Sequence, residues 1–287
     1  MQGVIAAVPT PVTPDGAPIS SLFEDHCQWL LTHGCDGLNI LGSTGEANSF
    51  DTETRRRVME LAARACPADR LMVGTGTPSL AETIALTKYA DDLGYGVALV
   101  LPPYYYKPLN EEGLIAWYMR LHVALGTRKI AIYFYNFPQM TGLTIPPSVM
   151  AELAEAAPQR FTGIKDSSGN LDYARDVLAV APGLAVFPSS ETALERAHAD
   201  GFAGCISATV NITSEAAGAI WAARQTPPAH LVALVAAQRA LLAGPDLIPC
   251  IKAVLAQRTG DDRWTSVLPP FIAYASGARL AQQLKAS

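Results

Sequence analysis

The chain has 287 residues, of which 49% are hydrophobic and 16% charged, with a formal net charge of −5. That length suits one large domain, or one domain with a small annex, and the apolar fraction is enough for a sizeable core. The net negative charge, and the absence of a long run of like-charged residues, argue against a nucleic-acid partner.

Short, continuously apolar runs recur through the first three quarters of the chain and predict parallel strands covered on both faces. Helical patterns lie between these runs, for example at residues 51–65 and 79–94. Eight strands that alternate with helices predict an α/β fold, a closed (β/α)8 TIM barrel. In chain order the predicted strands are Val4–Val8, Gly37–Leu41, Leu71–Gly74, Val97–Leu101, Ile130–Phe134, Phe161–Lys165, Leu184–Phe187 and Ala203–Ser207.

An open, doubly wound sheet is the alternative architecture. A dinucleotide-binding sheet of that kind should carry the motif G-x-G-x-x-G directly after a strand. The nearest match has Gly74 and Gly76, but Ser79 stands where the third glycine is required. The barrel is therefore the better interpretation of the pattern.

The strand pattern ends near residue 225, and the rest of the chain is predicted to be helical. Helical segments are expected at 230–244, Ile248–Arg258 and Leu268–Lys285, the last with several breakers. We divide the chain into a catalytic barrel, residues 1–225, and a C-terminal helical extension, residues 226–287. The extension, called the annex below, is not expected to be a second catalytic domain.

The cysteines and histidines limit which cofactors and which cellular location we expect. Five cysteines, none in a CxxC pair, predict reduced thiols in a cytoplasmic protein. Five histidines without HxH or HExxH spacing predict no metal site. The N-terminus lacks the features of a signal peptide, and no apolar stretch reaches the ~18 residues of a membrane span. We therefore expect neither a metal nor a membrane partner.

Lys165 is the first candidate for chemistry, because reactive groups of such barrels stand at the C-terminal ends of strands. It ends the sixth predicted strand and is one of six lysines; the other five are expected to be exposed. Burial in an apolar barrel mouth disfavours the ammonium form. The neutral amine would then be a nucleophile toward a ketone. An ammonium paired with Asp166 is the alternative interpretation.

Tyr135 closes the fifth predicted strand, beside the strand that ends at Lys165. Adjacent strands lie about 4.8 Å apart, so a phenol there is placed to transfer protons above the lysine. Packing at the barrel rim is the alternative role.

The turn Gly42–Glu46, with the sequence GSTGE, follows the second strand and offers N–H and O–H groups to an anion. Its alternative role as a helix cap is weakened because Asp51 can cap the next helix.

Five motifs, GSTGE, YYYKP, YNFPQMTG, GIKDSSG and GCISATVNI, occur in the order and spacing of one known family. The chain resembles the dihydrodipicolinate synthase / N-acetylneuraminate lyase family over roughly residues 3–225 and into the annex. The resemblance implies a class I aldolase-type lyase that forms a Schiff base between Lys165 and pyruvate or a pyruvyl-ended 2-oxo acid. It also implies no metal or organic cofactor, and a homotetramer built as a dimer of dimers.

The resemblance also implies roles for other residues. Tyr135 would relay protons with Thr44 and with Tyr105, which would reach into the neighbouring subunit's site. Ser43, Thr44 and the turn around them would hold the substrate carboxylate. The remaining implied substrate-binding residues are Gly45 in the turn, Ile206 at the pyruvate end, and Ser190 and Ser207 on the side of the second substrate.

Met140 marks a departure from the synthases of this family, which carry an arginine at that position to hold the carboxylate of aspartate semialdehyde. Methionine cannot make a bidentate carboxylate contact. The motif GIKDSSG is similar to that of family members acting on 2-keto-3-deoxy sugar acids or on 4-hydroxy-2-oxoglutarate, so the resemblance implies an aldolase for one of these acids. The alternatives are 4-hydroxy-tetrahydrodipicolinate (dihydrodipicolinate) synthase, a 2-keto-3-deoxy acid dehydratase, a metal-dependent class II aldolase, and a non-catalytic barrel that binds a 2-oxo acid.

Overall fold

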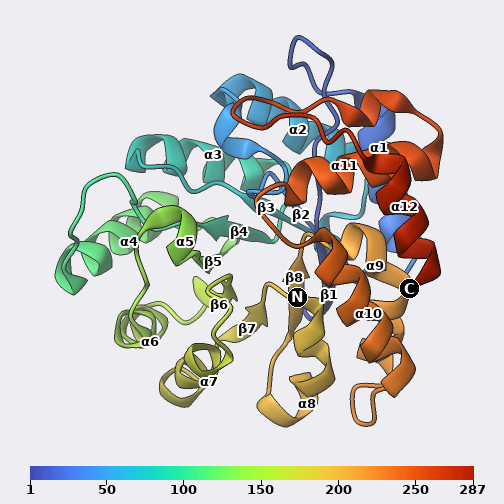
Figure 1. Cartoon of the computed structure of the whole chain (residues 1–287). Helices are drawn as coiled ribbons and strands as arrows, with labels where there is room; N and C mark the ends of the chain where they lie inside the picture. Colours follow the sequence, from blue (N-terminus) through green and yellow to red (C-terminus); the bar gives the residue numbers. More distant parts are fainter.

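The computed structural model describes residues 1–287, and its eight parallel strands form one curled sheet (Figure 1). The strand order is β7-β6-β5-β4-β3-β2-β1-β8. The N–H of Ala203 donates to the carbonyl of Val186 at 2.9 Å, which joins the two ends of this order. The predicted (β/α)8 TIM barrel is confirmed. The strands are β1 (Gly3–Ala7), β2 (Gly37–Ile40), β3 (Leu71–Gly74), β4 (Val97–Val100), β5 (Ala131–Asn136), β6 (Phe161–Asp166), β7 (Ala185–Pro188) and β8 (Gly204–Ser207).

Helices surround the sheet, and several begin at residues whose side chains cap them. Asp51, Ser79 and Asn110 each accept a hydrogen bond from an N–H in the first turn of the helix that follows. The barrel helices are α1 (Ser20–Thr32), α2 (Thr52–Ala65), α3 (Leu80–Asp92), α4 (Glu111–Leu125), α5 (Pro138–Thr141), α6 (Pro147–Ala156), α7 (Leu171–Val180), α8 (Ala197–Asp200) and α9 (Val210–Ala222), with the 3-10 turns η1 (Ala47–Ser49), η2 (Ala68–Arg70) and η3 (Glu191–Arg196).

Side chains of each strand alternate between two apolar layers. The outer layer, between strands and helices, is the large core and includes Ile164. The inner layer fills the barrel with eight buried side chains: Ile5, Met72, Val97, Leu99, Tyr133, Tyr135, Phe187 and Ile206. Because Ile164 faces outward, its neighbour Lys165 faces the barrel interior and Asp166 faces outward again.

The annex packs beside α1 and α9, with its helices drawn orange to red in Figure 1. Its elements are α10 (Ala229–Leu242), α11 (Leu247–Thr259), η4 (Asp262–Thr265) and α12 (Gly277–Ala286). An apolar cluster that includes Leu22 of α1, Leu255 of α11 and Trp264 of η4 joins the annex to the barrel. No single helix is long and apolar enough to cross a membrane, and α10 with α11 meets that test only as a pair bent by 111°.

Three expectations were wrong in detail. Strand β5 continues to Asn136, two residues beyond the predicted end at Phe134, and so includes Tyr135, which was expected to close it. The last predicted helix begins only at Gly277, because the prolines at 269 and 270 interrupt the segment before it. Lys252, expected to be exposed, is completely buried on α11.

His26 lies at the junction of α1, α9 and the annex. Its Nε2 is 2.9 Å from Oδ1 of Asn211, and its ring makes an edge contact with Trp264 at a centroid distance of 5.2 Å. Burial lowers the pKa of His26 from its ordinary 6.5 to about 4, with a smaller lowering from the charge of Arg258 and an opposing effect of Asn211. The neutral ring therefore belongs to the folded junction.

Acid should weaken this junction before it titrates the carboxylates. Below about pH 6.5 the unfolded chain takes up a proton that folded His26 accepts only near pH 4. The free energy of unfolding should therefore fall by about 3 kcal/mol as the pH drops through that interval. Urea unfolding from pH 4 to 7 measures the slope. His26→Gln should flatten it and the exposed His230→Gln should not; equal slopes for wild type and His26→Gln would contradict this assignment.

Candidate active site

Lys165 and Tyr135 face each other across neighbouring strands. They are register partners in the β5–β6 ladder, and Nζ of Lys165 lies 4.6 Å from the centre of the Tyr135 ring. The two side chains are only 4% and 3% exposed. Lys165 forms no hydrogen bond and no ion pair with any side chain of the protein. Its amine is therefore held against an aromatic face in the barrel mouth, without a counter-ion.

The alternative pairing of Lys165 with Asp166 is wrong. The Asp166 carboxylate points outward and accepts hydrogen bonds from Asn136 Nδ2 at 2.8 Å, from the N–H of Ser168 at 3.0 Å and from the Ser168 hydroxyl at 2.8 Å. Burial raises the pKa of Asp166, and these hydrogen bonds oppose that rise. This carboxylate anchors the loop after β6 and leaves Lys165 unpaired.

The turn Gly42–Glu46 lies next to Tyr135. Oγ of Ser43 is 3.3 Å from the Tyr135 hydroxyl, within hydrogen-bonding distance. The N–H groups of Gly45 and Glu46 donate within the turn, to the carbonyls of Gly42 and Ser43. The N–H groups of Ser43 and Thr44 have no acceptor in the chain. Two adjacent amide donors beside a phenol suit a carboxylate.

Thr44 is 94% buried in the turn, but its hydroxyl makes no hydrogen bond, so Ser43 is the turn residue that contacts Tyr135. Gly45 supports the turn through its carbonyl, which accepts from the Thr10 hydroxyl at 3.0 Å. Ile206 belongs to the inner layer with Tyr135, as expected of a residue at the pyruvate end. The structure thus brings the central part of the predicted set together.

Tyr105 and Met140 lie apart from this centre. Tyr105 is 72% exposed in the loop after β4 and stacks edge-on with Tyr106 at 5.3 Å. Met140, on α5, is 71% exposed and lines a cavity of about 220 Å³. Ser43 lines the same cavity, together with Tyr104 and Phe271. Met140 is thus an exposed apolar side chain of a cavity that reaches Ser43 and that Lys165 does not line.

Ser190 and Ser207 border a polar cluster that the sequence did not reveal. Ser190 contacts Thr192 at 2.6 Å between the hydroxyl oxygens, and the Ser207 hydroxyl donates to Glu191 at 2.6 Å. Ser207 is completely buried on the outer side of β8, since its neighbour Ile206 faces inward. Ser207 is therefore not brought to the amine of Lys165. An acidic residue three positions after β7 was the only available signal.

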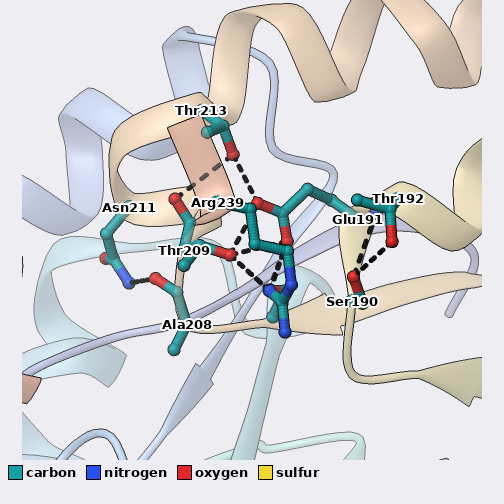
Figure 2. A network of polar contacts seen from close by, with 9 residues as sticks. Ser190, Glu191, Thr192, Ala208, Thr209, Asn211, Thr213 and Arg239 are labelled. Carbon is teal, nitrogen blue, oxygen red and sulfur yellow. Dashed lines mark hydrogen bonds and ion pairs between the residues drawn. The ribbon is translucent and has the colours of Figure 1, made fainter. Parts of the chain in front are cut away.

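Glu191 is the centre of this cluster, which Figure 2 shows. Its carboxylate is completely buried and accepts hydrogen bonds from Thr209 at 2.6 Å and from Thr213 at 2.9 Å. Arg239 of the annex forms an ion pair with it at 3.0 Å. A buried carboxylate needs such partners, because an unpaired one is strongly unfavourable. The cluster fixes the ends of β7 and β8 to α10.

No group of three or more His, Cys, Asp or Glu side chains lies close enough together to hold a metal ion. The absence of a cofactor remains a prediction of the sequence. What the barrel mouth does contain is a buried amine, a phenol, a hydroxyl and two free amide donors. An amine beside a phenol and a hydroxyl is a set of groups that can act on a carbonyl compound.

The chain belongs to the Dihydrodipicolinate synthetase family, whose profile matches residues 1–270. It is a lyase-like enzyme of that family. The resemblance inferred from the five motifs is thereby confirmed.

Relatives and solved structures agree with this assignment. An uncharacterized DapA-like lyase of Chloroflexus aurantiacus is 32% identical over 275 residues, covering 93% of this chain and 88% of the relative. Dihydrodipicolinate synthase from Agrobacterium tumefaciens superposes with a TM-score of 0.90 and 27% identity, covering 100% of this chain and 99% of the other. YagE, a family member of E. coli K12 solved with pyruvate, has a TM-score of 0.86 and 26% identity, with 99% of each chain covered.

Proposed function

We propose that the protein is a Schiff-base-forming lyase of the class I aldolase type, acting on a pyruvyl-ended 2-oxo acid. The observation that carries this proposal is the amine of Lys165, 4% exposed, unpaired, and 4.6 Å from the ring of Tyr135. Mere binding of a 2-oxo acid needs no reactive amine, so this arrangement favours catalysis over a non-catalytic barrel. The family member YagE was solved with pyruvate, which fits the same end of the substrate.

The site residues supply each step of the proposed reaction. The amine of Lys165 attacks the C2 ketone, and Tyr135 transfers protons until the carbinolamine loses water and becomes an iminium ion. The iminium accepts the electron pair of the C3–C4 bond while the C4 hydroxyl loses its proton, which releases an aldehyde. Protonation at C3 and hydrolysis then return pyruvate and the free amine. The N–H groups of Ser43 and Thr44 would hold the carboxylate throughout.

The distal end of the substrate is proposed from Met140. Its apolar side chain, which lines the same cavity as Ser43, offers no charge to a second carboxylate, which favours a 2-keto-3-deoxy sugar acid with a hydroxylated distal end. A 4-hydroxy-2-oxoglutarate-like acid, the other proposed substrate, would need a different group for its second carboxylate. 4-Hydroxy-tetrahydrodipicolinate synthase is the second candidate, because the Agrobacterium synthase matches the whole chain. A dehydratase would use the same iminium without breaking the C3–C4 bond.

We also propose a cytoplasmic homotetramer. The exposed aromatic pair Tyr105 and Tyr106, 72% and 77% accessible, supports a subunit contact there. In the dimer that this contact would form within the tetramer, Tyr105 would complete the proton relay in the partner's site.

Tyr135→Phe should lower kcat by about 10²- to 10⁴-fold, because it removes the proton-transferring hydroxyl. The phenyl ring keeps its place over Lys165, so folding should be unaffected. Steady-state kinetics with the best substrate measures the effect, and Tyr133→Phe serves as the matched control in the same strand. A Tyr135→Phe enzyme with a near-normal kcat would remove this phenol from the mechanism.

A substrate panel should show pyruvate release from a 2-keto-3-deoxy sugar acid or from 4-hydroxy-2-oxoglutarate, and none by Lys165→Ala. Sialic acid belongs in the same panel. Pyruvate with aspartate semialdehyde tests the second candidate through pyruvate consumption. Faster turnover of that pair than of any cleavage substrate would contradict the proposed specificity, whereas water loss without pyruvate release would identify a dehydratase.

A further inference from the structure

One buried ion pair connects the annex to the turn beside Tyr135. Glu46 is the last residue of the turn Gly42–Glu46, and Lys252 lies on α11, 206 residues further along the chain. Their charged groups are in direct contact, and both side chains are completely buried. The Lys252 ammonium also donates to the carbonyl of Ser266 at 2.9 Å, and Glu46 accepts from the N–H of Leu268 at 2.7 Å. One ion pair thus joins the turn, α11 and the segment after η4.

The turn that this pair holds has an uncommon backbone. Leu41 and Glu46, with φ of +53° and +55°, are the only non-glycine residues of the chain in the left-handed region. They bracket residues 42–45. Side chains disfavour this conformation, so it persists only where the surroundings impose it. The pair with Lys252 supplies that restraint at the Glu46 end.

The pair is also sensitive to position. Each charge is buried and would be strongly unfavourable without the other. Burial lowers the pKa of Lys252, and the Glu46 carboxylate opposes that shift. The ion pair therefore forms only when α11 places Lys252 against Glu46. This placement fixes the turn, and with it Ser43 and Thr44, relative to the barrel. Ser43 in turn contacts the Tyr135 hydroxyl.

We propose that Lys252 is a positioning residue for the substrate carboxylate: through Glu46 it holds the free N–H groups of Ser43 and Thr44 where a 2-oxo acid binds. The annex is then part of the binding site through Lys252, although Lys252 itself does not line the cavity of Ser43 and Met140. This inference rests on the proposed function. It requires that loss of the pair weakens binding of pyruvate more than it slows bond formation at Lys165.

The test compares Lys252→Met with the double variant Lys252→Met/Glu46→Gln, which leaves no unpaired buried charge and should fold even if the single variant does not. Borohydride trapping of pyruvate is measured over a range of pyruvate concentrations, and thermal unfolding confirms the fold. In both variants the half-saturating concentration should rise about tenfold or more, while the trapping rate at saturation changes less than about threefold. Lys129→Met, at an exposed position, is the control and should match wild type.

A purely structural pair would lower the unfolding temperature and leave the half-saturating concentration of pyruvate unchanged. That result in the folded double variant would overturn the inference. A fall in the saturating rate with unchanged half-saturation would also overturn it. Failure of the proposed function has a different signature, since wild type itself would then not be trapped at any pyruvate concentration.

Discussion

The site depends on one constraint: an amine must stay in an apolar barrel mouth without a carboxylate beside it. The strand geometry meets this constraint, because side chains of consecutive residues point to opposite faces of the sheet. The Lys165 Nζ lies 4.6 Å from the centre of the Tyr135 ring. The neighbouring Asp166 points outward and accepts hydrogen bonds from Asn136 and Ser168. A paired ammonium would be a poor nucleophile. The separation of these two neighbours therefore makes the proposed chemistry possible.

The annex contributes to the site from outside the barrel. Two buried carboxylates at the strand ends, Glu46 and Glu191, take their cations from it: Lys252 on α11 and Arg239 on α10. Glu46 belongs to the turn Gly42–Glu46, and Glu191 lies at the ends of β7 and β8. The annex thus contacts two parts of the barrel rim through buried ion pairs.

The local sequence pattern predicted the fold and the proximity of Lys165, Tyr135 and the turn around Ser43, because both follow from short-range rules. Apolar runs of strand length showed the barrel, and the rule for strand ends selected Lys165 and the turn around Ser43. The ion pairs with the annex could not be predicted, since Glu46 and Lys252 are 206 positions apart and no periodicity links them. Lys252 looked exposed because one helix alone does not show what covers it. Ser207 was wrongly expected near the substrate for a related reason. Whether it points into the barrel or outward depends on which residues of β8 face inward, which the sequence alone does not show.

The most direct test of the account is to locate the covalent bond that it requires. Wild-type protein is incubated with pyruvate and borohydride, digested, and mapped by peptide mass. The account predicts a reduced pyruvyl adduct on the peptide that contains Lys165, none on the peptide with buried Lys252, and no adduct in Lys165→Ala. An unlabelled wild type, or an adduct that persists in Lys165→Ala, would contradict it.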